Sequence, residues 1–71
     1  MRKPRILILC CGAGTVALPF WEAGWEVVAL DIDPQIEAKR GLTVIRADIR
    51  DVNPADLGRF DAIWFSPPCE R

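Results

Sequence analysis

The sequence predicts an α/β protein built on a parallel sheet of about four strands, with helices mainly on one face. Two observations predict this fold. Residues 6–9 are apolar at every position, which is typical of a strand covered on both faces. Further β-rich runs alternate with helical or turn-rich segments, as in right-handed βαβ units. The length of 71 residues allows one domain, residues 1–71, near the lower size limit for a self-sufficient core.

Four strands and two helices are expected in alternation. The strands are residues 5–10, 25–31, 42–47 and 60–65. The helices begin at residue 15 or 16 and run to about residue 23, and then cover residues 34–40, each followed by a glycine as its stop. Pro19 falls in the first turn of the first helix, where its missing N–H costs little. Asp33 is the expected N-cap of the second helix, with Pro34 as its first residue.

The predicted packing of these elements leaves one face of the sheet without a covering layer. Ala17, Phe20 and Trp21 recur at helical spacing and are expected to pack on the sheet, and all three tryptophans are expected in the core. Residues 49–59 contain Asn-Pro and a glycine, so we expect at most one helical turn there. Both helices then cover the same face, and nothing remains for the other. The isolated chain is therefore expected to form a homodimer, to associate with a complementing chain, or to be marginally stable.

Composition narrows the classes of function. The chain is 51% hydrophobic and 27% charged, with a formal net charge of -1, so it carries no basic excess that would indicate nucleic-acid binding by itself. Arg2, Lys3 and Arg5 are expected to form a solvated basic end. No histidine and no Cys-x-x-Cys pair is present among the three cysteines, which predicts no metal site and reduced thiols in the cytoplasm. The short apolar run after Arg5 is too brief for a membrane span.

Four motifs follow the ends of the four predicted strands. Because parallel strands end at one edge, these motifs are expected to share a ligand-binding rim. They comprise Cys11, Gly12, Ala13 and Gly14, then Asp31 and Ile32, then Asp48 and Ile49, and finally Ser66, Pro67 and Cys69. Glycines after a buried strand let a ligand approach the backbone at a helix start. The rim therefore predicts a nucleotide-type ligand.

Individual rim residues have both functional and structural interpretations. Asp31 is placed to accept hydrogen bonds from a ribose diol, or it is a charge at a helix start. Asp48 is a candidate acceptor for an exocyclic amine, with Ile49 as an apolar wall, or it is a turn residue. Cys69 follows two prolines that hold its thiol at the rim, and is a candidate nucleophile or an unreactive cysteine. Cys10 and Cys11 suit core or turn positions.

These motifs, in this order and spacing, resemble class I S-adenosylmethionine-dependent methyltransferases, and more narrowly the N-terminal part of DNA cytosine-5 methyltransferases, including short phage-type ones. The resemblance implies a partial Rossmann-like fold and S-adenosylmethionine as cofactor. It implies that the glycine loop holds the methionine part, that Asp31 binds the ribose, and that Asp48 with Ile49 binds the adenine. It implies DNA as substrate, flipped out of the duplex, with Cys69 attacking cytosine C6.

The chain also departs from that family. Ile8 and Cys10 stand where the family often has Asp-x-Phe, which removes an aromatic contact to the adenine, and Glu70 stands where Gln is common. The Glu-Asn-Val motif and the target-recognition region of the family have no counterpart here. Two alternatives remain open. One is an amino-methyltransferase for N4-cytosine or N6-adenine that uses the Ser-Pro-Pro loop. The other is a non-catalytic module from a truncated gene that binds cofactor or a partner chain.

Overall fold

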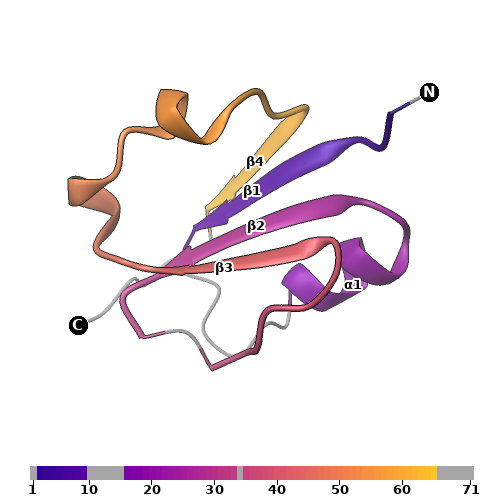
Figure 1. The fold of residues 1–71 in the computed structure, drawn as a ribbon, viewed down its shortest axis with the longest axis horizontal. Helices are drawn as coiled ribbons and strands as arrows, with labels where there is room; N and C mark the ends of the chain where they lie inside the picture. Colours follow the sequence, from indigo (N-terminus) through magenta and orange to yellow (C-terminus); the bar gives the residue numbers. More distant parts are fainter. Residues whose placement is uncertain (1, 10–15, 34, 66–71) are drawn as a thin grey trace.

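A four-stranded parallel sheet forms the centre of the molecule (Figure 1). The computed structural model describes residues 2–9, 16–33 and 35–65. The strand order is β3-β2-β1-β4. In chain order the elements are β1 Arg5–Leu9, α1 Ala17–Glu22, β2 Glu26–Asp31, β3 Leu42–Arg46, the 3₁₀ turns η1 Ile49–Asp51 and η2 Pro54–Leu57, and β4 Ala62–Phe65. The predicted fold class is confirmed, and the strand bounds agree to within two residues.

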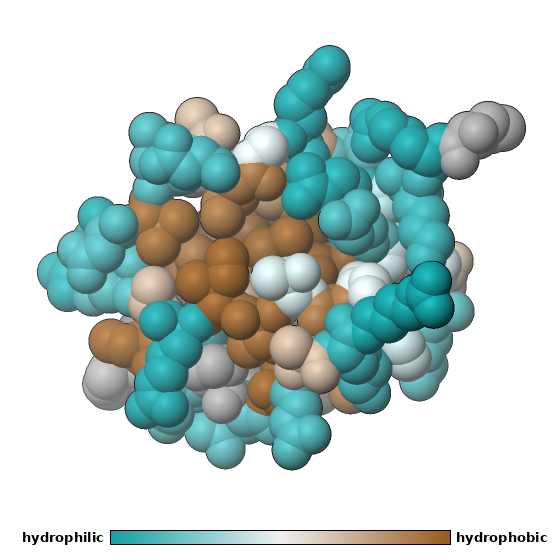
Figure 2. Space-filling model, in the orientation of Figure 1, coloured by the Kyte–Doolittle hydropathy of each residue, from teal (hydrophilic) through white to brown (hydrophobic). Residues whose placement is uncertain are grey.

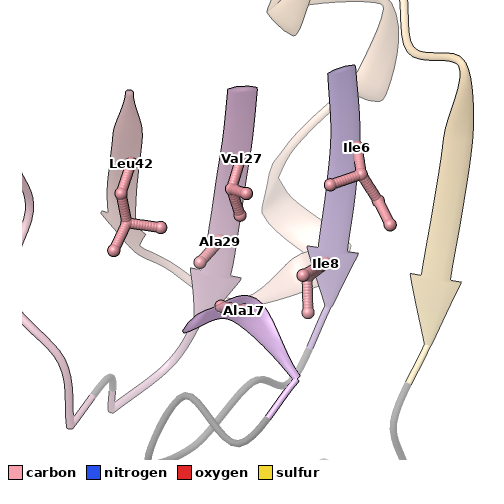
Figure 3. Packing of buried hydrophobic residues seen from close by; sticks show 6 residues of the cluster. All are labelled: Ile6, Ile8, Ala17, Val27, Ala29 and Leu42. Atoms are coloured by element: carbon pink, nitrogen blue, oxygen red, sulfur yellow. The ribbon is translucent and has the colours of Figure 1, made fainter. Parts of the chain in front are cut away.

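Helix α1 covers one face of the sheet and completes the main core. Figure 3 shows side chains from β1, β2 and β3 pointing to this face, where Ala17 of α1 meets them. The buried cluster consists of Ile6, Ile8, Ala17, Val27, Ala29 and Leu42. Phe20 and Trp21 pack against it, as their helical spacing predicts, and Gly24 follows the helix with a φ of 99°. Burying each large aliphatic side chain contributes about 1.5–3 kcal/mol, so this layer supplies much of the stability.

The opposite face is partly covered, which corrects the expectation that nothing remains to cover it. Leu7, Val28 and Leu30 alternate with the main cluster and are at most 4% exposed. The connection from β3 to β4 passes behind the strands when the sheet is viewed from α1 (Figure 3). A right-handed crossover requires this position, because the chain returns past β2 and β1 to reach β4. The prediction did not place residues 49–59 on this face, because it expected at most one helical turn there. The structure instead has two separate 3₁₀ turns in the segment that crosses the sheet.

Strand β4 remains the open part of the sheet. Ile63 and Phe65 on the face opposite α1 are 62% and 52% exposed, and Trp64 on the α1 side is 45% exposed. Figure 2 shows the face opposite α1, where hydrophobic side chains gather in the middle and hydrophilic ones surround them. The expectation that Trp64 lies in the core is therefore wrong. As the last strand of the sheet, β4 has no neighbour on its outer side among the described residues, and its side chains are left uncovered.

The predicted second helix is absent from described residues 35–40. Lys39 and Leu42 instead exchange backbone hydrogen bonds of 3.0 and 2.8 Å across a tight turn that contains Gly41. Because the N–H of Lys39 donates to Leu42 in this turn, it cannot make a helical hydrogen bond. The residues before Lys39 are too few to form a stable isolated helix. Asp33 is therefore not a helix N-cap, and α1 is the only α-helix in the described part of the chain.

Arg5 in β1 forms hydrogen bonds with the connection between β3 and β4. Its guanidinium donates to the carbonyl oxygens of Arg59 at 2.8 Å and Leu57 at 3.3 Å, and its backbone N–H donates to the Asp61 carboxylate at 2.8 Å. Gly58 makes room for this contact, since a Cβ there would lie 2.8 Å from Nη1 of Arg5. Arg5 is thus a structural residue and not part of a solvated basic end.

Candidate functional site

The ends of the four strands meet at one edge of the sheet, as the rim hypothesis requires (Figure 1). Leu9, the last residue of β1, pairs with Leu30 of β2 and with Phe65 of β4. Asp31 pairs with Arg46, and the next N–H, that of Ala47, donates to the carbonyl oxygen of Asp31 at 3.0 Å. This hydrogen bond extends the pairing to within one residue of Asp48. The register therefore brings Asp31 and Asp48 to neighbouring strand ends.

Asp31 is the last residue of β2 and begins a turn, not a helix. Its Oδ1 accepts a hydrogen bond of 3.0 Å from the backbone N–H of Asp33, the local pattern of an Asx turn. This finding rules out the interpretation of Asp31 as the charge at a helix start. Ile32 follows with 45% of its surface exposed, so an apolar side chain is available at the rim beside the two acids.

Asp48 caps η1 and forms an ion pair with Arg50. Its Oδ1 accepts the backbone N–H of Arg50 at 2.9 Å, and its Oδ2 accepts Nη2 of the same arginine at 2.7 Å. Hydrogen bonds from the Arg50 side chain, and then from its backbone N–H, lower the pKa of Asp48 from 3.8 to about 2. The turn interpretation of Asp48 is confirmed, and its carboxylate is ionised at neutral pH.

Several predicted site residues lie outside the described residues. These are Cys11, Gly12, Ala13, Gly14, Ser66, Pro67 and Cys69. In the sequence, the first group follows β1 and the second group follows β4. Ile49 begins η1 immediately after Asp48. Among the predicted site residues, the structure therefore describes Asp31, Ile32, Asp48 and the backbone of Ile49.

Two arginines at the rim were not identified from the sequence. Arg50 binds Asp48, and Nη2 of Arg46 lies 3.9 Å from Oδ1 of Asp33. For Arg50 a sequence signal exists, because an Asp that caps a turn faces the second residue after it, and Asp48-Ile49-Arg50 has that spacing. Arg46 could not be assigned from spacing, since its contact depends on the pairing of β3 with β2.

The described rim fits the adenosyl part of S-adenosylmethionine in its chemistry. Asp31 and Asp48 carry carboxylates, the type of acceptor that hydroxyl and amine donors need, although both already accept hydrogen bonds within the chain. Ile32 exposes an apolar side chain that suits a flat ring. In the described ranges no group of three or more His, Cys, Asp or Glu could hold a metal ion, and no helix there is long and apolar enough to cross a membrane. An open apolar pocket of about 180 Å³, lined by Pro19, Phe20, Ala23 and Trp25, lies at the amino end of β2, away from the rim.

We predict that Asp48 titrates with a pKa of about 2 and that Arg50→Gln raises this value. Because the folded-state pKa lies below the unfolded one, the contact stabilises the fold above about pH 4. This stabilisation is lost as the pH falls towards 2. Carbon-detected NMR of the carboxyl group measures the titration, with Arg46→Gln as a control that leaves it unchanged. An unaltered Asp48 pKa in Arg50→Gln would contradict the assignment.

Comparison with known proteins identifies the family. A family profile described as "Methyltransferase domain" (Methyltransf_11) matches residues 7–67. The chain is 29% identical over 69 residues to "Putative methyltransferase YqeM" of Bacillus subtilis (strain 168), covering 86% of this chain and 28% of the relative. It is 35% identical over 71 residues to "Type II methyltransferase M.FnuDI" of Fusobacterium nucleatum, covering 93% of this chain and 21% of the relative. No solved structure matches significantly.

These matches cover most of this chain but only about a fifth to just over a quarter of the two relatives. The parallel four-stranded sheet is consistent with a Rossmann-like methyltransferase fold, and domains of this kind typically use S-adenosylmethionine. Since the family profile covers far more than half of its residues, the chain belongs to the methyltransferase domain family.

Proposed function

We propose that this chain is the cofactor-binding part of an S-adenosylmethionine-dependent methyltransferase, and that the carboxyl edge of the sheet holds the cofactor. One observation carries the proposal: the register of β2 with β3 brings Asp31 and Asp48 to neighbouring strand ends. Two fixed carboxylates at a sheet edge suit a ligand with separated hydroxyl and amine donors, and parallel sheets bind ligands outside this edge.

Each rim residue has a proposed role within this site. Asp31 accepts the ribose hydroxyls, and Asp48 accepts the exocyclic amine of the adenine while Ile49 contacts the base. Gly12 and Gly14 leave room for the methionine part, as the resemblance implies. The cofactor supplies an activated methyl group on its sulfonium.

For the methyl acceptor we propose cytosine C5 in DNA. The supporting observations are the Ser-Pro-Pro-Cys motif, which follows β4 in the sequence, and the similarity to a type II methyltransferase. In this proposal the Cys69 thiolate adds to C6 of a flipped cytosine, and C5 becomes nucleophilic enough to take the methyl group, which leaves S-adenosylhomocysteine. Loss of the C5 proton to water and departure of the thiolate from C6 then restore the C5–C6 double bond. The net charge of -1 implies that other parts of the enzyme supply the cations that bind DNA.

A second candidate is methyl transfer to an acceptor other than DNA. The general description of the matching family and the similarity to the Bacillus subtilis relative favour it. Both candidate functions use the same proposed cofactor site. Cofactor binding and the identity of the methyl acceptor are therefore tested by separate experiments.

Asp48→Asn is expected to weaken binding of S-adenosylmethionine by about tenfold or more, the value of a hydrogen bond to a charged group. Isothermal titration calorimetry on the 71-residue chain measures this loss. Asp56→Asn in η2 is the matched control, because it removes an exposed carboxylate far from the rim, and its affinity should equal that of the original chain. Equal loss in both variants would reject a specific role for Asp48.

Cys69→Ser is expected to abolish the covalent adduct between the full-length gene product and a 5-fluorocytosine oligonucleotide. The serine hydroxyl is too weak a nucleophile at neutral pH to replace a thiolate. Denaturing gel electrophoresis detects the adduct, and Cys10→Ser is the control that should retain it. An adduct that persists in Cys69→Ser, or an active enzyme that traps no cytosine at all, would favour the second candidate.

A further inference from the structure

We propose that Arg50 occupies the acceptor atoms of Asp48 before the cofactor binds, so that the adenine amine must displace its guanidinium. Arg50 is then an internal competitor that lowers affinity for adenosyl ligands. This inference rests on the proposed function, since it assumes that Asp48 is the acceptor for the adenine amine.

The hydrogen bonds of Asp48 carry the argument. Oδ1 accepts the backbone N–H of Arg50 at 2.9 Å and its Nε at 3.1 Å. Oδ2 accepts Nη2 at 2.7 Å and lies 3.3 Å from Nε. An ionised carboxylate offers about four lone-pair sites, and three N–H groups of Arg50 occupy most of them, with the Nε–H shared between the two oxygens. An incoming amine therefore competes with the guanidinium for the acceptor sites of Asp48.

The guanidinium is free to leave without disturbing the site. The Arg50 side chain is 85% exposed, whereas that of Asp48 is 22% exposed. Rotation of the arginine side chain releases Oδ2 completely and leaves the backbone hydrogen bond to Oδ1 intact. Asp48 therefore remains positioned by the cap of η1, and its Oδ2 becomes available to another donor.

The size of the effect follows from the exposure of the pair. An exposed ion pair contributes little because water and salt screen it, and its removal changes an equilibrium by a factor of about two to five. Loss of the guanidinium should tighten binding by that factor at low salt, and the gain should shrink as the salt concentration rises. A residue that contacts the cofactor favourably would have the opposite sign.

The test compares dissociation constants of three forms of the chain for S-adenosylhomocysteine and for its inosyl analogue, in which a carbonyl replaces the amine. The forms are the original chain, Arg50→Gln and Arg46→Gln. Arg46 is the matched control, since it is 75% exposed at the same edge and faces Asp33 at 3.9 Å. Removing it reproduces the loss of one positive charge without freeing Asp48.

We expect Arg50→Gln to bind S-adenosylhomocysteine about two- to fivefold more tightly, with no gain for the inosyl analogue and none for Arg46→Gln. Equal or weaker binding by Arg50→Gln would overturn the inference while leaving the cofactor site intact. An equal gain in both variants would show a general charge effect and would also overturn it. Absence of binding by all three forms would reject the proposed function itself, and the inference with it.

Discussion

The parallel pairing of β1 with β2 is the constraint on which the rest of the structure depends. Both strands are buried on both faces at their centres, so their register cannot slip without exposing apolar side chains or burying polar ones. β3 pairs with β2 and β4 pairs with β1, each in its own parallel register. Together the three pairings bring residues far apart in the sequence, such as Asp31 and Asp48, to the same edge.

The strands could be predicted because their signal is local. Continuous apolar runs indicate burial on two faces, and the ends of such runs fix where the strands stop. The second helix was predicted wrongly because its proline and cap signals are also local, whereas the turn that joins Lys39 to Leu42 depends on how β3 enters the sheet. The cover on the second face was missed for a similar reason, since 3₁₀ turns leave no apolar periodicity.

The acids of the site could be predicted, and the spacing of Asp48 and Arg50 also carries a signal for their contact, but the arginine partner of Asp33 could not be predicted. Asp31 and Asp48 can be assigned to the site because each follows a predicted strand. The contact between Arg46 and Asp33 cannot be predicted in this way, because it depends on the register between β2 and β3. The backbone and the side chain of Arg50 have different roles at this edge. Its backbone completes the cap that orients Asp48, and its side chain occupies the same carboxylate that the proposed cofactor requires. In our proposal, the contact that satisfies Asp48 within the chain therefore competes with the cofactor for the same carboxylate.

The most direct test of the account is an amide NMR spectrum of the 71-residue chain titrated with S-adenosylmethionine. We predict dispersed signals and saturable shifts at Asp31, Asp33, Asp48 and Arg50, together with Gly12 and Gly14, while Trp25 at the opposite edge stays unchanged. Shifts confined to the apolar pocket around Phe20 and Trp25, or no shift at high cofactor concentration, would contradict the claim that the carboxyl edge is a cofactor site.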